Sequence, residues 1–159
     1  MKRKLCVAVW GMSLLTACSI PKAGAPEWFE NAVETSGRQL LYMAEQLENV
    51  PDTACFPRSV KEDGSYRLEN AKDWTSGFYP GSMWLAYDLT GDEALAKEAR
   101  MYTNRLEDIQ YYIGNHDIGF MMFCSYGHAL RLKPESKDKQ ILVNSSESLC
   151  ARFSPEVGL

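Results

Sequence analysis

Three short segments of the sequence hold most of the side chains that could do chemistry. They are residues 56–58 (FPR), residues 73–81 (DWTSGFYPG) and residues 115–121 (NHDIGFM). The second segment combines aromatic rings with glycine, which lets a backbone approach a ligand closely. The ring of Trp74 could stack on the apolar side of a sugar, or it could close the top of a helical bundle as a core residue. From the residues alone the core role is the better supported, because large aromatic side chains dominate core burial.

His116 and Asp117 lie where the third segment enters a predicted helix. A carboxylate at such a position can accept backbone N–H bonds and serve only as a helix N-cap. In a cleft, the same carboxylate could act as an acid, a base or an anchor for hydroxyl groups. The residues alone do not separate these two roles of Asp117.

The cysteines do not indicate a metal site. The body of the chain contains Cys55, Cys124 and Cys150, an odd number at irregular spacing, which predicts neither a zinc site nor a closed disulfide framework. One pair among them and buried free thiols that behave as small hydrophobic residues both fit the sequence. We therefore expect no metal ion and no cofactor.

A succession of helices is expected to position these segments. Apolar residues recur at helical spacing, and Asp92 is a natural N-cap directly after a helix-ending Gly91. The expected helices cover residues 27–50, 80–91, 92–109, 119–132 and 136–153. No segment shows the sustained two-residue alternation of an amphipathic strand, so residues 51–76 are expected to form a loop. The sequence predicts an all-α fold of paired helices.

Composition and charge limit the class of protein. A chain of 159 residues that is 45% hydrophobic and 24% charged is typical of one soluble globular domain. The net charge of −4 and the pI near 5.2 argue against a nucleic-acid partner, which would need a basic stripe.

The N-terminal residues have the order of a bacterial export signal. Basic residues 2–4 precede an apolar stretch, residues 5–15, that is too short to span a bilayer. Residues 15–18 (LTAC) resemble the lipobox of bacterial lipoproteins, in which the cysteine receives a diacylglyceryl chain. We therefore expect a signal peptide over residues 1–17, a lipid on Cys18, a tether over residues 18–26 and one domain over residues 27–159.

This organisation predicts a protein of the bacterial cell envelope, in the periplasm or at the outer membrane. The lipid would be its only contact with the membrane. A plain signal peptide and an N-terminal helix of a cytosolic protein are the alternatives.

The motifs resemble those of a known family in their order and spacing. The matching segments are residues 74–81 (WTSGFYPG), 84–92 (WLAYDLTGD), 116–121 (HDIGFM) and 125–127 (SYG), with residues 56–58 upstream. Together they resemble the signatures of the unsaturated glucuronyl hydrolases, glycoside hydrolase family 88. The resemblance covers roughly residues 56–159 and, more loosely, residues 27–50.

The resemblance implies an (α/α)6 barrel, or toroid, of which about five helices are present, so the chain would form an incomplete barrel. It implies hydration of the C4=C5 double bond in the terminal unsaturated uronic acid of oligosaccharides released by polysaccharide lyases, instead of displacement at the anomeric carbon. The hemiketal that forms then opens and releases the neighbouring sugar. Asp117 matches an aspartate described as a nucleophile or as an anchor for sugar hydroxyls. Trp74 matches a residue that stacks near the substrate, and His116 would support substrate binding.

The chain departs from the family in one respect. The second catalytic aspartate, the proton donor, and the later residues that bind the uronate would lie beyond residue 159. A partial barrel also leaves apolar helix faces exposed to water, which costs about 25 cal/mol of free energy per Å² of apolar surface. We therefore expect a fragment of a longer protein or a truncated gene product that is inactive by itself.

Three other functions fit the sequence. The chain could be a glycan-binding surface lipoprotein without catalysis, a relative acting on unsaturated rhamnogalacturonan, or a decayed fragment without present function. Residues 116–119 (HDIG) favour the glucuronyl family over the rhamnogalacturonan one. The parent polysaccharide and the oligomeric state stay open.

Overall fold

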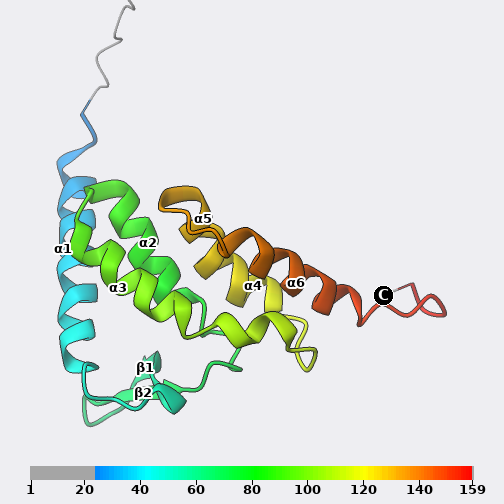
Figure 1. Ribbon diagram of the computed structural model, residues 1–159. Coiled ribbons are helices and arrows are strands. Elements are labelled where there is room, and N and C mark those ends of the chain that lie inside the picture. Colours follow the sequence, from blue (N-terminus) through cyan, green and yellow to red (C-terminus); the bar gives the residue numbers. More distant parts are fainter. Residues whose placement is uncertain (1–23, 159) are drawn as a thin grey trace, which may run out of the picture.

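The computed structural model describes residues 24–158, which are mostly helical (Figure 1). The helices are α1 (Glu27–Gln46), α2 (Phe78–Thr90), α3 (Glu93–Asn104), α4 (Ile118–Met122), α5 (His128–Leu132) and α6 (Asp138–Cys150). A π-helical segment, Phe123–Gly127, joins α4 to α5, so that residues 118–132 form one irregular helix and the described chain contains five in all. The predicted signal peptide and the predicted lipid site at Cys18 lie outside the described residues.

The helix ends follow the local sequence. The Asp92 carboxylate accepts a hydrogen bond from the Ala94 N–H at 2.9 Å, which caps α3 as predicted. Gly91 ends α2 with a φ of 72°, a conformation that costs glycine little. Three helices are shorter than predicted: α1 ends at Gln46, α3 ends at Asn104, and α6 runs only from Asp138 to Cys150. A separate 3-10 turn, Glu107–Tyr111, follows α3.

The prediction that residues 51–76 form a loop without strands is wrong. Strand β1 (Phe56–Val60) pairs with the antiparallel strand β2 (Tyr66–Glu69) in a two-stranded sheet. Phe56 is the one fully buried residue of the hairpin, and its ring meets that of Tyr102 edge to face at 6.0 Å. Because the rest of the hairpin is exposed or half-buried, its strands lack the apolar alternation by which sequence reasoning finds a strand.

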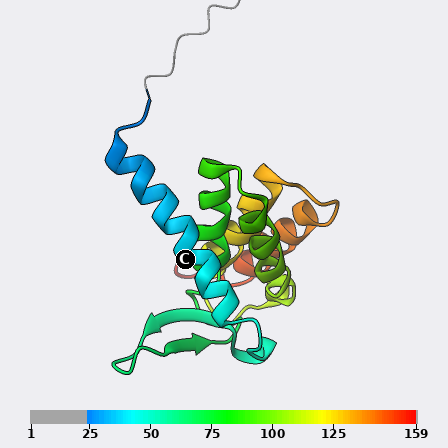
Figure 2. The same ribbon diagram turned by 90° about the vertical axis from the view of Figure 1, so that its left-hand side faces the viewer.

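Helices α2 and α3 form a central pair with other helices on both of its sides. Helix α1 packs against α2 and α3, whereas α4, α5 and α6 lie on the other side of that pair, and the hairpin lies at one end (Figures 1 and 2). The core between them contains Trp84, whose Nε1–H donates to the Thr103 hydroxyl at 3.0 Å. The N-terminal half of α1 projects away from the other helices (Figure 2). None of the helices described is both long and apolar enough to cross a bilayer.

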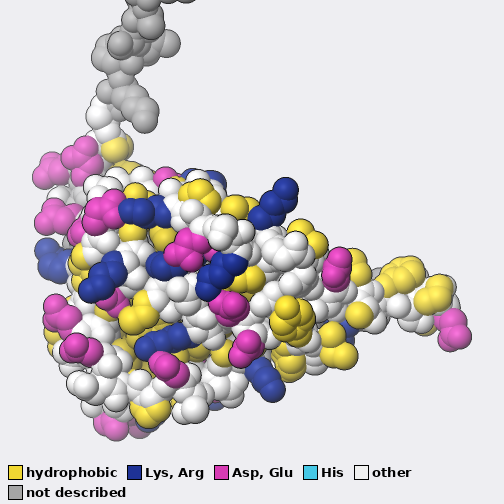
Figure 3. All heavy atoms as spheres, in the orientation of Figure 1, with side chains coloured by type: hydrophobic (Ala, Val, Ile, Leu, Met, Phe, Trp, Pro, Cys, Tyr) yellow, Lys and Arg dark blue, Asp and Glu magenta, His cyan; other side chains and the backbone are white. Residues whose placement is uncertain are grey.

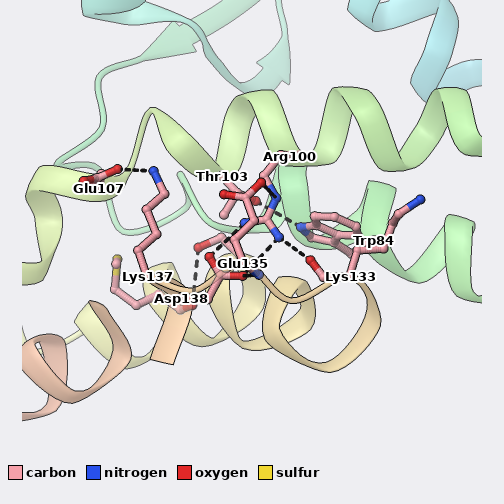
Figure 4. Close-up of polar contacts among 10 residues, drawn as sticks. Trp84, Arg100, Thr103, Glu107, Lys133, Glu135, Lys137 and Asp138 are labelled. Atoms are coloured by element: carbon pink, nitrogen blue, oxygen red, sulfur yellow. Dashed lines mark hydrogen bonds and ion pairs between the residues drawn. The ribbon is translucent and has the colours of Figure 1, made fainter. Parts of the chain in front are cut away.

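A buried ion pair fastens α3 to the start of α6 (Figure 4). Two guanidinium nitrogens of Arg100 contact the two carboxylate oxygens of Asp138 at 2.9 and 3.0 Å, and Asp138 is 0% exposed. Arg100 also donates to the Lys133 carbonyl at 2.6 Å and lies over the ring of Trp84. Elsewhere, over α1 and α3, basic and acidic side chains are intermixed on the surface (Figure 3).

Candidate functional site

The fold brings the three predicted segments together. Arg58 of β1 donates to Asp73 at 2.8 Å, which joins the first segment to the second. A Cβ atom on Gly77 would lie only 2.2 Å from the Met121 carbonyl oxygen, so the backbone of the second segment lies directly against α4 in the third. Only glycine allows such an approach. Segments more than 40 residues apart in the sequence therefore form one surface.

Trp74, Phe78 and Phe120 form a row of aromatic rings on this surface, which we call the aromatic row. The rings of Trp74 and Phe78 lie 5.7 Å apart, and those of Phe78 and Phe120 lie 6.2 Å apart, both edge to face. The three residues are 41%, 37% and 55% exposed. Trp74 therefore does not close the core, a role that the fully buried Trp84 has instead. Its ring is free to meet a ligand, and its role in substrate binding stays a prediction.

Asp117 occupies the N-cap position of α4, but its carboxylate accepts no capping hydrogen bond. The Asp117 N–H donates to the Asn115 side-chain oxygen at 2.9 Å, and this turn of the backbone orients the residue. The carboxylate is 20% exposed, and His116 Nε2 lies 3.4 Å from it. The His116 side chain is 79% exposed. The geometry thus favours a carboxylate available to a ligand over one that serves as a cap.

Asp117 and Phe120, one member of the aromatic row, share the first turn of α4. The Met121 N–H donates to the Asp117 carbonyl at 3.1 Å, which closes that turn. Residues three positions apart lie on the same side of a helix, so Phe120 and Asp117 face the same way. A sugar ring stacked on the row would have a carboxylate within reach of its hydroxyl groups.

The loop that carries Trp74 is held by Asp73. Asp73 accepts hydrogen bonds from both the N–H and the hydroxyl of Thr75, at 3.0 and 2.6 Å, and it pairs with Arg58. Partial burial acts to raise the pKa of Asp73, but the Thr75 hydrogen bonds and the Arg58 guanidinium outweigh it and hold that pKa below its ordinary value. The sequence alone assigns no particular role to Asp73 or Arg58. The Asp-x-Thr spacing indicates the turn, whereas the partner 15 residues away leaves no local signal.

Other parts of the described chain fit a ligand less well. An open hollow of about 710 Å³ lies beside the buried ion pair, lined by Trp84, Arg100 and Lys133 among others, and it contains none of the predicted site residues. Within residues 24–158 no group of three or more His, Cys, Asp or Glu side chains could hold a metal ion. Cys55 is buried, Cys124 is half-buried and Cys150 is exposed, and each is a free thiol.

Comparison with known proteins identifies the class. No family model matches the chain. A crystal structure of an unsaturated glucuronyl hydrolase specific for heparin superposes with a TM-score of 0.75 at 39% identity, over 84% of this chain and 35% of that one. The corresponding enzyme of Bacillus sp. GL1 superposes with a TM-score of 0.57 at 24% identity. The fold is thus part of an (α/α)6 barrel.

Sequence comparison points to the same proteins as the fold does. The unsaturated glucuronyl hydrolase of Formosa agariphila is 38% identical over 117 residues, which are 71% of this chain and 29% of that protein. The Bacillus sp. GL1 enzyme is 27% identical over 108 residues. The chain is homologous to the unsaturated glucuronyl hydrolases of glycoside hydrolase family 88, and it spans about a third of their length.

Proposed function

We propose that this chain forms the part of an unsaturated glucuronyl hydrolase that binds the terminal unsaturated uronic acid of lyase-generated oligosaccharides. The observation that carries this proposal is the uncapped Asp117 carboxylate, which shares the first turn of α4 with the exposed Phe120 ring of the aromatic row. A ring face for stacking beside a carboxylate for hydroxyl groups is the combination that a sugar requires. The relatives support the choice of sugar. One of them, from Streptococcus agalactiae, is described in complex with dGlcA-GalNAc6S.

The proposed reaction adds water across the C4=C5 double bond. An acid transfers a proton to C4, the oxygen of water bonds to C5, and one proton of that water leaves to a base while the other stays on the new hydroxyl group. The hemiketal at C5 then opens and releases the neighbouring sugar. In this scheme Asp117 anchors a sugar hydroxyl or acts on the reacting carbon, His116 steadies the carboxylate, and Trp74 stacks on the ring.

We further propose that these 159 residues bind the sugar without turning it over. The resemblance implies a proton donor beyond residue 159, and the chain spans only 29% of the Formosa agariphila enzyme. Without an acid to protonate C4, hydration would lack the proton transfer that typically contributes 10²–10⁴-fold. The proposed binding uses the aromatic row and Asp117, which this chain contains, and the later residues that contact the uronate would strengthen it.

Two measurements on the same sample test this function. Titration calorimetry measures the binding of unsaturated disaccharides prepared from chondroitin and from heparin, and the loss of their ultraviolet absorbance measures turnover. Asp117→Asn should weaken binding, whereas the matched control Asp108→Asn, at an exposed position, should not. Equal binding of saturated and unsaturated disaccharides, or no binding of either, would contradict the proposal.

A glycan-binding protein without catalysis is the second candidate, because the aromatic row suits it equally well. The two candidates differ when the homologous remainder of a barrel is fused to this chain. Asp117→Asn should then abolish turnover in an enzyme while changing the affinity of a simple binder little. A hydrolase of unsaturated rhamnogalacturonan is the third candidate, and its disaccharide serves as a further probe in the same assays.

We also propose that the protein is held at the cell envelope by a lipid on Cys18. The order of basic residues 2–4, apolar residues 5–15 and the lipobox-like residues 15–18 supports this location. Labelling of bacteria that express the chain with a radioactive fatty acid should mark the parent and not Cys18→Ser. Equal labelling of both would refute lipidation at this residue.

A further inference from the structure

Strand β1 contains an irregularity at Arg58. Pro57 pairs with Leu68 and Ser59 pairs with Arg67, so Arg58 is the extra residue between two consecutive pairs. Such a bulge bends a strand and re-aims one of its side chains, and bulges are common beside active sites. The Arg58 side chain reaches beyond the hairpin to Asp73, where Nη1 lies 2.8 Å from Oδ2.

The Arg58–Asp73 pair belongs to a row of alternating charges. Arg67 contacts Glu69 at 2.9 Å, Glu69 lies 3.9 Å from Arg58, and Arg58 contacts Asp73. The side chains of Arg58 and Asp73 are 34% and 14% exposed, so the pair is shielded from solvent more than an ordinary surface pair is. The hairpin therefore has a specific attachment to the loop that follows it.

This attachment fixes the backbone on both sides of Trp74. One oxygen of Asp73 holds Arg58, and the other accepts the two hydrogen bonds from Thr75. Trp74 lies between these residues, and its ring extends to Phe78. Further along the loop, the buried Ser76 hydroxyl donates to the Ala71 carbonyl at 3.0 Å.

We propose that Arg58 is a positioning residue: the bulge aims it at Asp73, and this contact holds Trp74 in place for the sugar. The inference rests on the proposed function, because it concerns the same binding surface. At 41% exposure, Trp74 gains less from burial than a core tryptophan does, so its orientation depends on the loop. A ring that is ordered before binding loses less conformational freedom when the ligand arrives.

Tryptophan fluorescence tests the proposal without any ligand. In the full chain carrying Trp10→Phe and Trp28→Phe, the remaining tryptophans are Trp74, which is exposed, and Trp84, which is 0% exposed. Acrylamide quenching therefore reports on Trp74, while the protected emission of Trp84 reports that the fold is intact.

In this background we expect Arg58→Met to raise the quenching constant of the exposed tryptophan by up to about twofold, because exposure can rise from 41% to complete. Arg58→Lys should restore part of the protection. Arg67→Met removes an arginine of the same hairpin that does not contact Asp73, and it should leave quenching unchanged. Unchanged quenching in Arg58→Met with protected Trp84 emission would overturn the proposal.

A second variant covers the case in which Arg58→Met does not fold. Asp73→Asn keeps an acceptor oxygen for Thr75 and removes the charge that Arg58 pairs with. It should raise quenching as Arg58→Met does, and unchanged quenching in this variant overturns the proposal.

Binding of the disaccharide dGlcA-GalNAc6S gives an independent measurement. Arg58→Met should raise the Kd about two- to tenfold, the range expected when one side chain must be ordered on binding, and Arg58→Lys should recover part of the loss. An unchanged Kd would contradict the role in sugar binding. If the parent chain does not bind the disaccharide, the proposed function fails, and the quenching experiment still decides whether Arg58 positions Trp74.

Discussion

Substitution of one glycine tests whether the loop and helix α4 really meet at the candidate site. We expect Gly77→Ala to destabilise the chain strongly. The added methyl group would lie 2.2 Å from the Met121 carbonyl oxygen and 2.6 Å from the Met121 Cα. Both are backbone atoms, which cannot rotate away as the end of a side chain would.

The cost follows from this geometry. Real Cβ contacts are not shorter than 3.0 Å, so the loop and α4 must separate by about an ångström. Overpacking typically costs about 1–3 kcal/mol, and because the three nearest atoms all belong to the Met121 backbone, we expect Gly77→Ala to cost about 3 kcal/mol. The φ of Gly77 is −74°, which alanine adopts freely, so the whole cost is steric. Separation would also move Trp74 away from Asp117 and weaken sugar binding.

Urea denaturation, followed by far-ultraviolet circular dichroism, measures the free energy of unfolding. Gly119→Ala is the matched control, because its Cβ meets nothing within 4 Å and it lies inside α4. That variant should be more stable than the parent by up to about 1 kcal/mol, since alanine is the better helix former. Equal effects of the two substitutions, or a loss below about 1 kcal/mol for Gly77→Ala, would refute the contact between loop and helix.

Three further predictions concern the elements around the site. Arg100→Met leaves the buried Asp138 carboxylate without its partner and should lower the free energy of unfolding by about 3–5 kcal/mol, whereas Arg131→Met, at an exposed ion pair, should cost at most about 1 kcal/mol in the same urea titration. Asp92→Ala removes the N-cap of α3 and should cost about 1 kcal/mol, and an unchanged urea midpoint would show that the cap is dispensable. Because the pKa of Asp73 is lowered on folding, its stabilisation is present above the unfolded-state pKa and lost as the pH falls through the folded-state pKa. The advantage of the parent over Asp73→Asn should therefore shrink on acidification, and a constant advantage would contradict the shift.

The helices could be predicted because their determinants are local. The N-cap at Asp92 and the left-handed Gly91 act within a few residues, and both predictions are confirmed. The β-hairpin could not be predicted by the same reasoning, because Phe56 is the one residue of its strands that is fully buried. Phe56 attaches the hairpin to the core by its contact with Tyr102, a residue far away in the sequence. Tertiary packing thus accounts for strands that the spacing of apolar residues in the sequence does not predict.

The candidate site, too, could be predicted only in part. Trp74 and Asp117 could be singled out from their residue types and neighbours. The sequence could not show whether the Trp74 ring is buried in the core or whether the Asp117 carboxylate caps a helix. For Asp117 the answer depends on the conformation of the turn, in which Asn115 accepts from its backbone N–H and its carboxylate accepts no capping hydrogen bond. For Trp74 it depends on the contact of Phe78 with Phe120, which lies 42 residues further along the chain. The resemblance to a family predicted the grouping, and the contacts account for it physically.

The candidate site obtains its support from a short part of this chain. The contacts that hold Trp74 and Asp117 all come from residues 56–121, namely the bulge at Arg58, the close approach of Gly77 and the first turn of α4. The contacts that position these two side chains are therefore complete within a chain that spans about a third of its relatives' length. The same third exposes large apolar side chains on α2 and on the π-helical segment, where Leu89 is 58% and Phe123 is 71% exposed. Such faces are ordinarily covered by further protein. If the proposed function holds, a chain that orders Trp74 and Asp117 internally should bind the unsaturated disaccharide even with these apolar faces open, and titration calorimetry on this chain checks that outcome.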